Sequence, residues 1–537
     1  MPLPHIEHAR PSCAVPVWAA EQLILRRSLE DWIDTEISRY ETEGFVRLFG
    51  QRGGHALDEA GGYTRSFVST YCLNGDARIA RFLKRFRDDW HDAVTAAGHF
   101  HHGYDANEDG DYITHTAEAF TQFLLNVLYL DITDTRTVAM VEDAAEHLGN
   151  WHPAVQDWYD WDAHVFRSYF LGTRSPYHRP PYDFQTTRHF RVLAIAAAAY
   201  EATGNDRYLE LCRDYWLTWE ERLRTAAPSQ DVCLEFKRID ADRIRAFAAQ
   251  PEIMADWRFH RYYRRELEHL GLVPETRAAD KRVPAWKYKA ATPLHTPHDL
   301  MMTMLDVLRF LPRDDSLRQG LRQVMDWWIR QGGDGVSQIA GIDPHCGVHL
   351  PKYRHITGDT SLDAAYLAQW PVGPCSYLLT GDPVRLTGVA SLADATFRQA
   401  LRRNSGDFGP DFAVDHACDV ASNAGTSSAY VMPALFMPAL GGLGVHYGRA
   451  PWLRVLYYSD GQLGLPADIA ARYVPATEAG RPIVELYNSG DTPHRIGVRG
   501  IDPATTTGLA LDAPPRTDLR PVAVPPGAVT QVAVPSA

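Results

Sequence analysis

The strongest constraint on the fold of this chain is a repeated unit, in which an apolar segment runs into a tight turn built on Asp or Asn and an amphipathic segment follows. The segment Gln122–Leu130 is apolar nearly all round, whereas Arg207–Trp216 after a later turn carries charge on one face. Helical hairpins repeated in this way predict a toroid or solenoid. The turns are Asn74–Asp76, Thr133–Thr135, Gly204–Asp206, Arg313–Asp315 and Gly381–Pro383.

The pattern predicts two sets of helices that alternate along the chain. Apolar helices, packed on every side, are expected at Thr64–Leu73, Thr114–Leu130, Thr186–Ala202, His298–Leu311, Leu362–Leu379 and Ser427–Leu440. Amphipathic helices are expected between them at Arg78–Ala97, Arg136–Trp151, Arg207–Arg224, Ser316–Gln331 and Val384–Arg402. The uneven spacing of the turns excludes an open solenoid of uniform repeats.

Two regions depart from the repeat. Residues 225–295 are interpreted as an insertion with extra helices at Asp240–Gln250 and Ile253–Leu272. After residue 450 glycine, proline and β-branched residues become frequent and period-2 segments appear, which predicts a small antiparallel β domain. We therefore divide the chain into a helical domain, 1–450, and a linker with a β domain, 451–537.

Three segments of the predicted β domain have strand periodicity. They are Ile483–Tyr487, Arg495–Arg499 and Val529–Val534. Asn488–Asp491 lies between the first two and has the composition of a hairpin turn, so these two strands are expected to pair with each other.

Composition excludes several classes of protein. The formal net charge of -13 over 537 residues, with no dense basic run, makes nucleic acid an unsuitable partner. No apolar stretch reaches the roughly 20 residues of a membrane span, and Met1–His8 lacks the features of a secretory signal. Seven scattered Cys without a CxxC spacing argue against a disulfide scaffold and a structural zinc site, so we expect a cytoplasmic protein.

The predicted loops are asymmetric, and this asymmetry suggests where a site lies. The apolar helices are followed by short turns but preceded by long loops, which scaffolds commonly use for function. Of the 23 His, 13 lie in these loops or in the first helical turn after them, where even scatter would leave about five. They are His55, His99, His101, His102, His115, His178, His189, His295, His298, His345, His349, His355 and His416.

The same loops predict an anionic ligand. If the apolar helices run in parallel, their N-termini converge at the loop end and present partial positive charge and free N–H groups. Arg65, Arg188, Lys352 and Arg354 lie there in an otherwise acidic chain, and aromatic side chains such as Trp286 could stack on sugar faces. A uronate-containing glycan is a natural candidate.

By architecture the chain resembles the (α/α)6-toroid carbohydrate-active enzymes, which include six-hairpin glycoside hydrolases and toroid polysaccharide lyases. The resemblance covers about residues 30–450, and many of these enzymes add a β domain. It implies a mainly α fold, an (α/α)6 toroid followed by a small antiparallel β domain, and an oligosaccharide or polysaccharide substrate. The chain carries no signature motif such as the Asn-Asn-His of lyases.

The leading hypothesis is a lyase that cleaves an acidic glycan by β-elimination. Such an enzyme neutralises the uronate carboxylate, removes the C5 proton and protonates the leaving oxygen. The catalytic candidates are His189, Tyr182, His115, Asp111 and Asp183. The substrate-binding candidates are Arg65, Arg188, Gln185, His298, Tyr353, His355 and Trp286.

Three alternatives stay open. A glycoside hydrolase of the same fold would use paired carboxylates, for which Asp111, Asp183 and Asp299 are available. A sugar epimerase, isomerase or dehydratase would use the same ring, and a non-catalytic protein would only bind glycan. The sequence leaves the oligomeric state undetermined.

No cofactor is required by this chemistry, but one segment resembles a calcium loop. Asp105, Asn107, Asp109 and Asp111 have the spacing of its opening ligands, whereas Thr116 stands where the closing bidentate acid is expected. An Asp/Asn/Gly turn without metal is the commoner explanation of such a segment.

Overall fold

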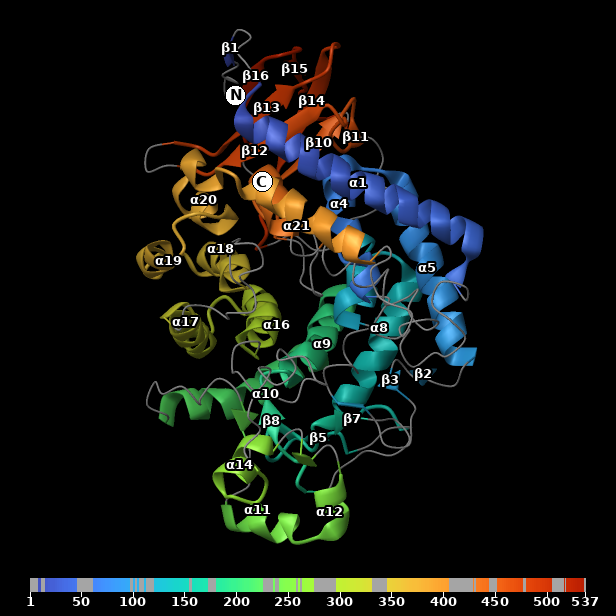
Figure 1. Cartoon of the computed structure of the whole chain (residues 1–537), viewed down its shortest axis with the longest axis vertical. Coiled ribbons are helices and arrows are strands. Elements are labelled where there is room, and N and C mark those ends of the chain that lie inside the picture. Colours follow the sequence, from blue (N-terminus) through green and yellow to red (C-terminus); the bar gives the residue numbers. More distant parts are fainter. Residues whose placement is uncertain are drawn as a thin grey trace.

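The protein, described by a computed structural model, is mainly helical and has a smaller antiparallel sheet region (Figure 1). No helix within the described ranges is both long enough and apolar enough to cross a bilayer. The structure describes residues 8–10, 15–45, 61–96, 100–101, 104–105, 111–112, 120–153, 157–171, 180–225, 235–236, 241–256, 259–260, 263–274, 296–330, 345–404, 428, 431–443, 452–476, 480–504, 516 and 518–535.

The helices alternate between buried and partly exposed ones along the chain. They are α1 (Val17–Glu43), α4 (Phe67–Asn74), α5 (Ala77–Ala96), α7 (Leu125–Leu130), α8 (Thr135–Leu148), α9 (His189–Thr203), α10 (Asp206–Thr225), α11 (Ala241–Ala248), α12 (Pro251–Ala255), α14 (Arg264–His269), α16 (Thr296–Phe310), α17 (Asp315–Arg330), α18 (His345–Thr357), α19 (Asp363–Gln369), α20 (Pro374–Thr380) and α21 (Val389–Asn404). A π-helical turn, η1 (Phe120–Leu124), precedes α7, a 3-10 turn, η4 (Pro383–Leu386), precedes α21, and residues 431–440 are helical.

The predicted Asp and Asn turns are confirmed. Each joins a buried helix to the next partly exposed one, and its side-chain oxygen accepts a backbone N–H of the following turn of chain. Asp134, for example, accepts from the Thr137 N–H at 3.0 Å and Asp314 from the Leu317 N–H at 3.0 Å. Gly204 ends α9 with φ of 70°, a left-handed conformation that glycine adopts without strain.

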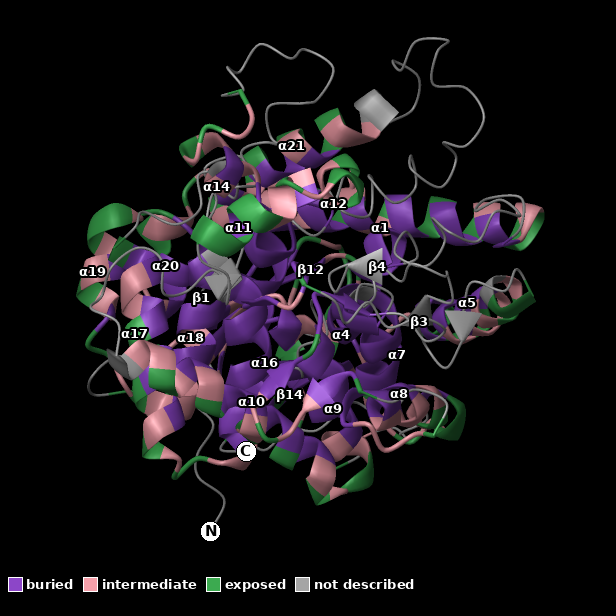
Figure 2. Cartoon of the chain, turned by 90° about the horizontal axis from the view of Figure 1, so that it is seen from below, coloured by how far each residue is buried: buried purple, intermediate pink, exposed green. Residues whose placement is uncertain are grey.

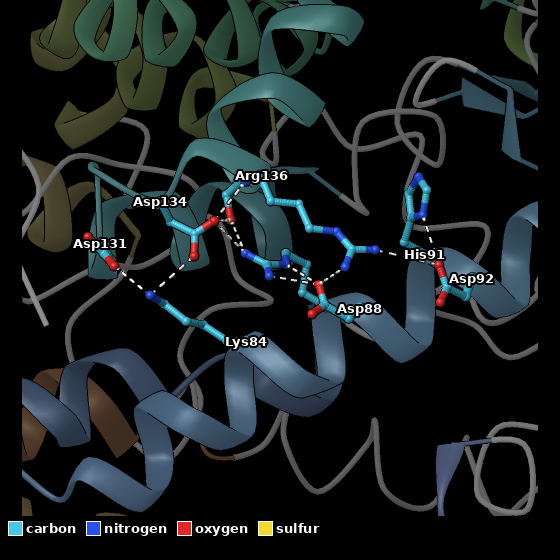
Figure 3. A network of polar contacts seen from close by, with 9 residues as sticks. Lys84, Asp88, His91, Asp92, Asp131, Asp134 and Arg136 are labelled. Carbon is cyan, nitrogen blue, oxygen red and sulfur yellow. Dashed lines mark hydrogen bonds and ion pairs between the residues drawn. The ribbon is translucent and has the colours of Figure 1, made fainter.

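One of these turns is also held from a neighbouring helix (Figure 3). Lys84 of α5 bonds Asp131 at 2.6 Å and lies 3.1 Å from Asp134, and Arg87 lies 2.8 Å from Asp134. Burial opposes the charge of Asp134, but the Thr137 N–H, Arg87 and Lys84 outweigh it and lower the pKa of its carboxyl. The turn therefore fixes α7, α8 and α5 relative to one another.

The prediction that residues 331–361 form a loop is wrong for its second half, where α18 forms. Its residues from Cys346 to Leu350 are buried, and Gly358 and Asp359 end it with the same glycine and Asp turn as the other hairpins. Asp359 accepts the Ser361 N–H at 2.8 Å. Pro351 lies inside this helix, and because proline is unfavourable in a helix interior, helix propensity does not predict a helix here.

The expected single helix Leu362–Leu379 is wrong too, because it is two helices, α19 and α20. The break comes at Trp370–Gly373, where Gly373 has φ of 145° and Pro374 then starts α20. The expected helix Ile253–Leu272 is likewise interrupted between α12 and α14, because Asp256 and Tyr263 are not helical. In each case the apolar or mixed sequence continues through a residue at which the helix is interrupted.

The C-terminal region forms two four-stranded antiparallel sheets with orders β1-β16-β13-β12 and β11-β10-β14-β15. Their strands are β1 (His8–Arg10), β10 (Val455–Ser459), β11 (Gln462–Leu463), β12 (Ile469–Val474), β13 (Ile483–Asn488), β14 (His494–Gly500), β15 (Val522–Val524) and β16 (Val529–Ala533). Short pairs join β2 (Phe100–His101) to β3 (Tyr104–Asp105), β4 (Asp111–Tyr112) to β7 (Phe170–Leu171), β5 (Tyr159–Asp160) to β6 (Val165–Phe166), and β8 (Gln185–Thr186) to β9 (Glu235–Phe236).

The predicted hairpin at Asn488–Asp491 is wrong, because β13 and β14 belong to different sheets. Both strands have a buried apolar face, with Val484 and Leu486 on one and Ile496 and Val498 on the other. An isolated hairpin would leave such a face open, whereas two sheets in contact through β15, β13 and β16 cover both. β1 has no predicted counterpart; it lies at the opposite end of the chain and pairs with β16.

The buried core is continuous from the helices into the sheets. Figure 2 shows the buried residues gathered in the middle, along α4, α7, α9 and α16, with exposed residues on the helices around them. Helix α1, which had no predicted counterpart, packs along α21 and against β12, and Arg26 of α1 donates to the Leu465 and Ile469 carbonyls at 2.7 and 3.1 Å. The helical and sheet regions thus share an interface built on buried hydrogen bonds.

Two aspartates at equivalent turns provide a stability prediction. Asp314→Ala should cost about 1 kcal/mol, because it removes one helix cap and an ion pair with the largely exposed Arg213. Asp134→Ala should cost about 3 kcal/mol, because it also removes a partner of the buried Arg87. Urea unfolding of both variants checks this, and equal losses would contradict the role given to the α5 contacts.

Candidate functional site

The buried helices α9, α16 and α18 run parallel, and two layers of polar contacts prove it. Arg191 near the start of α9 contacts Asp299 near the start of α16, and Glu201 contacts Arg309 near both ends, with the same sequence offset of 108 in each pair. Between α16 and α18, His298 contacts His349 and Asp306 contacts Lys352, again in the same order. The N-termini of the three helices therefore lie at one end.

The first layer, which we call the N-terminal layer, consists of Arg191, Asp299, His298 and His349. Arg191 Nε donates to Asp299 Oδ1 at 2.9 Å, and the Asp299 side chain is 2% exposed. The negative charge of Asp299 lies in the first turn of α16, where the helix dipole stabilises it.

The two imidazoles of this layer form a direct hydrogen bond. His298 Nδ1 and His349 Nε2 are 2.9 Å apart, both rings are buried, and Trp328 of α17 packs against His349 at 5.8 Å. One of these nitrogens donates and the other accepts. When the donor ring takes up a proton on its other nitrogen, the shared proton can pass to the second ring without movement of either ring. Of the substrate-binding candidates within the described residues, His298 is thus the one that contacts a second imidazole.

Two arginines flank other N-termini of buried helices. Arg188 is the residue before α9, half-buried, and Arg65 lies two residues before α4 and is buried. Ser66, between Arg65 and α4, accepts a hydrogen bond from Ser428 at 2.8 Å. The residue before α4 therefore lies beside Ser428, which precedes the helical residues 431–440. Helix N-termini and guanidinium groups together favour a carboxylate ligand.

The second layer, the C-terminal layer, is a buried ionic network of Glu201, Asp306, Arg309, Lys352 and Tyr129. Glu201 and Arg309 lie 2.6 Å apart with side chains 1% and 2% exposed. Lys352 bonds Asp306, both nearly inaccessible, and the Tyr129 hydroxyl bonds Glu201. Two cations thus meet two anions, and the network is neutral as a whole.

The charged groups of the C-terminal layer hold the helices together through buried ion pairs. Burial opposes the charge of Arg309, but Glu201 and Asp306 outweigh it and raise the pKa of the guanidinium, so it stays charged. Burial also raises the pKa of Tyr129, which keeps its hydroxyl neutral. The contacts connect α7, α9, α16 and α18 and hold them in register.

His189, the leading catalytic candidate from the sequence, is wholly buried at the start of α9. Its Nε2 lies 3.3 Å from the Ser168 carbonyl and its Nδ1 3.1 Å from the Thr186 N–H, and the ring stacks on Phe166. Burial lowers the pKa of His189 to about 4, so it is neutral at pH 7. Both nitrogens serve the backbone, which favours a supporting role over proton transfer to substrate.

The neighbouring candidates are engaged in similar ways. The Tyr182 hydroxyl donates to Asp256 Oδ2 at 2.6 Å, which ties this segment to the inserted helices. The Gln185 side-chain amide donates to the Phe166 carbonyl at 2.5 Å and accepts a hydrogen bond from the Phe166 N–H at 3.3 Å. It thus makes the two hydrogen bonds that the backbone of a neighbouring strand would make. Asp183 is half-buried beside them.

Two further candidates lie away from the N-terminal layer, further along α18. Tyr353 donates to Asp359 at 2.8 Å in the turn after the helix. His355 Nε2 contacts Asp502 at 2.8 Å and its ring also accepts from Arg454, so it joins the helix to the β region. They follow His349 on α18 by four and six residues, and their hydrogen bonds run to the turn after the helix and to the β region.

The remaining candidates fall where side chains are not described. His115, Trp286, Asn107 and Asp109 lie outside the described residues, and for Asp105 in β3 and Asp111 in β4 the structure describes only the backbone. Asp111 is paired with Leu171 through the backbone. The calcium loop therefore stays a prediction.

Arg191 and His349 are not among the catalytic and substrate-binding residues predicted from the sequence. Arg191 is two residues after His189 and looks like any charge on an apolar helix. His349 was counted among the loop histidines, and the Gly358-Asp359 turn was the available signal that its segment is helical. Comparison of the chain with protein-family models, curated proteins and solved structures finds no match.

The neutral His189 predicts a specific pH dependence of stability. Its pKa is lower in the folded chain than in the unfolded one, so only the unfolded chain takes up a proton as pH falls from about 6.5 to about 4. His189 should therefore contribute a loss of about 3 kcal/mol of folding free energy over that window. His189→Gln should remove it, so the stability difference between variant and wild type should change with pH below 6.5 and be constant above. A difference independent of pH would contradict the buried neutral imidazole.

The C-terminal layer predicts strong coupling between its members. Lys352→Met alone should cost about 3–5 kcal/mol, because it leaves the buried Asp306 without its cation. The double variant Lys352→Met, Asp306→Leu removes both charges and should recover most of that loss. Urea unfolding of the wild type, both single variants and the double variant measures the coupling, and additive losses would show that the pair does not interact.

Proposed function

We propose that this protein is a carbohydrate-active enzyme that cleaves an acidic, uronate-containing glycan by β-elimination, and that its helices form a closed toroid. The observation that carries the proposal is the N-terminal layer, where an imidazole pair and an Arg–Asp pair meet at the N-termini of parallel helices. Acid–base groups and positive potential at one place are what elimination next to a carboxylate requires.

Contacts along the chain support closure into a ring. Successive buried helices contact one another from α4 through α7, η1, α9, α16 and α18 to α20. The last partly exposed helix, α21, packs on the first, α1, and Ser428 bonds Ser66. The described residues contain six buried helices that are each followed by a partly exposed one, namely α4–α5, α7–α8, α9–α10, α16–α17, α18–α19 and α20–α21. Residues 431–440 form a further buried helix. With α1 as the partner of that helix, we propose a ring of seven hairpins.

The proposed chemistry uses His298 and His349 for proton transfer. One imidazole takes the C5 proton of the uronate, electrons move to form the C4–C5 double bond, and the bond from C4 to the leaving oxygen breaks. The leaving oxygen takes a proton, which the pair can supply because the two rings share a hydrogen bond. Product carries the conjugated double bond that hydrolysis does not create.

Substrate orientation is assigned to the arginines. Arg188 and Arg65 stand before the N-termini of α9 and α4, where the helix dipoles add to their charge. Arg191 bonds Asp299, and this pair holds α9 and α16 together beside His298, so Arg191 has a positioning role. We assign the uronate carboxylate to Arg188 and Arg65 because of their places before the helix N-termini.

The test is turnover of uronate oligosaccharides of different linkage, followed by ultraviolet absorbance of the unsaturated product. His298→Gln and His349→Gln should each lower kcat by roughly 100- to 10,000-fold. The double variant should be little worse than either single one, because the two rings act as one unit.

His494→Gln is a matched control, because His494 is also hydrogen-bonded, to Asp468, but lies in the β region. It should retain activity. Cleavage without absorbance would identify a hydrolase instead, and absorbance undiminished in both layer variants would remove the imidazole pair from the mechanism. Thermal melting of each variant separates loss of chemistry from loss of fold.

A further inference from the structure

The two imidazoles of the N-terminal layer share a hydrogen bond but have different surroundings. Their ring centroids are 4.9 Å apart and their planes are inclined by 60°, so the rings meet through their nitrogens and are not stacked. His298 comes from α16 and is 5% exposed, whereas His349 comes from α18 and is wholly buried. Burial disfavours a positive charge on both rings, so the differences between their surroundings decide which ring holds a proton better.

The helix dipole disfavours a positive charge on His298. This residue is the third of α16 and lies in its first turn, where unpaired backbone N–H groups give the helix end a partial positive charge. His349 is the fifth residue of α18, beyond the first turn, where this effect has largely fallen off. An imidazolium therefore costs less free energy on His349 than on His298.

An indole ring favours a positive charge on His349. The ring centroids of Trp328 and His349 are 5.8 Å apart, within the ~6 Å over which an aromatic face attracts a cation. Their planes are inclined by 38°, which is nearer to stacked than to edge-on. Both side chains are wholly buried, and the attraction is stronger where water is excluded.

Charged side chains close to these rings do not fix the proton on either of them. Among the described side chains, those within one helical turn of His298, His349 or Trp328 form ion pairs, and each pair adds no net charge. The pairs are Asp299 with Arg191, Lys352 with Asp306 and Asp326 with Arg330. The helix dipole and the indole remain, and both favour the charge on the ring of α18.

The two rings also differ in their distance from the outer helices. Trp328 belongs to the partly exposed helix α17, and within the described part of the chain its ring contacts His349 and not His298. His349 is therefore the ring nearer to the outer layer. His298 is the less buried ring and lies at the start of its helix, which is the end that carries the proposed site.

We propose that His298 is the ring that contacts the substrate, that His349 holds the proton taken from it, and that Trp328 is a positioning residue that stabilises the charged His349. These roles rest on the proposed elimination. They assign a separate task to each member of the imidazole pair and add a third residue to the site.

The proton transfer balances with the two rings alone. Nε2 of His298 takes the C5 proton, and the proton on its Nδ1 passes across the 2.9 Å hydrogen bond to Nε2 of His349. His298 is then neutral and His349 is an imidazolium. The C5–H electron pair forms the C4–C5 double bond, and the leaving oxygen keeps the pair of its bond to C4. Nε2 of His298 then gives its proton to that oxygen, and the shared proton returns to Nδ1.

The first experiment is a pH titration of the full chain with 15N-labelled imidazoles, which needs no substrate. The nitrogen shifts of the two rings, assigned with His298→Gln and His349→Gln, show which ring becomes charged when the pair takes up one proton. We expect the charge on His349. A charge on His298, a charge shared equally, or a pair that stays neutral down to the pH of unfolding overturns the proposal.

Variants of Trp328 test its role in the same titration. Trp328→Leu should lower the pKa of the pair by about one pH unit, because the indole face is lost. Trp328→Phe should lower it less, because an aromatic face remains, and it is the variant to use if the leucine variant does not fold. Trp327→Leu is the matched control, because Trp327 precedes Trp328 on α17 and is only partly buried. It should leave the pKa unchanged, and equal shifts in both leucine variants, or none in either Trp328 variant, overturn the role of Trp328.

Turnover of uronate oligosaccharides separates this proposal from the proposed function. If the pair is the base, the acidic limb of the pH profile of kcat should move to lower pH in Trp328→Leu by the same amount as the titration. A profile that stays in place while the titration moves overturns the transfer to His349. Absence of elimination on every uronate tested, with the titration as expected, rejects the proposed function and the proton transfer but keeps the place of the charge and the role of Trp328.

Discussion

The parallel alignment of α9, α16 and α18 is the constraint on which the site depends. Three apolar helices in contact could slide along one another at little cost, because aliphatic packing is not directional. The ionic contacts Glu201–Arg309 and Lys352–Asp306 are directional and buried, and a slip by one residue would leave charges without partners. Their cost of burial is offset only in one register, and that register aligns the first turns of the helices.

Alignment of the first turns is what creates the N-terminal layer. His298 and Asp299 are adjacent in sequence, yet their partners come from different helices, His349 on one side and Arg191 on the other. The site is thus an outcome of register rather than of a local motif. On α16 His298 lies near the start of the helix and Arg309 of the ionic network near its end, so stability and the proposed chemistry use different residues.

The sequence by itself determined the alternation of buried and partly exposed helices and the turns between them, because hydrophobic periodicity and Asp or Asn capping are local properties. It also indicated histidine-rich approaches to the buried helices, among them His298. It failed where the signal was not local: α18 contains Pro351 and was not predicted, and β13 and β14 belong to different sheets although the sequence predicts a hairpin. The sequence also could not show that both ring nitrogens of His189 face backbone groups.

Only the tertiary structure decided which polar residues meet. Arg191 finds Asp299 across 108 residues and His349 finds His298 across 51, and nothing in the local pattern distinguishes these side chains from others on the same helices. Burial decides it, because a charge or imidazole removed from water must be satisfied by whatever the packing brings within reach. Which partner lies within reach depends on the register between the helices, and the packing of the whole helical region sets that register.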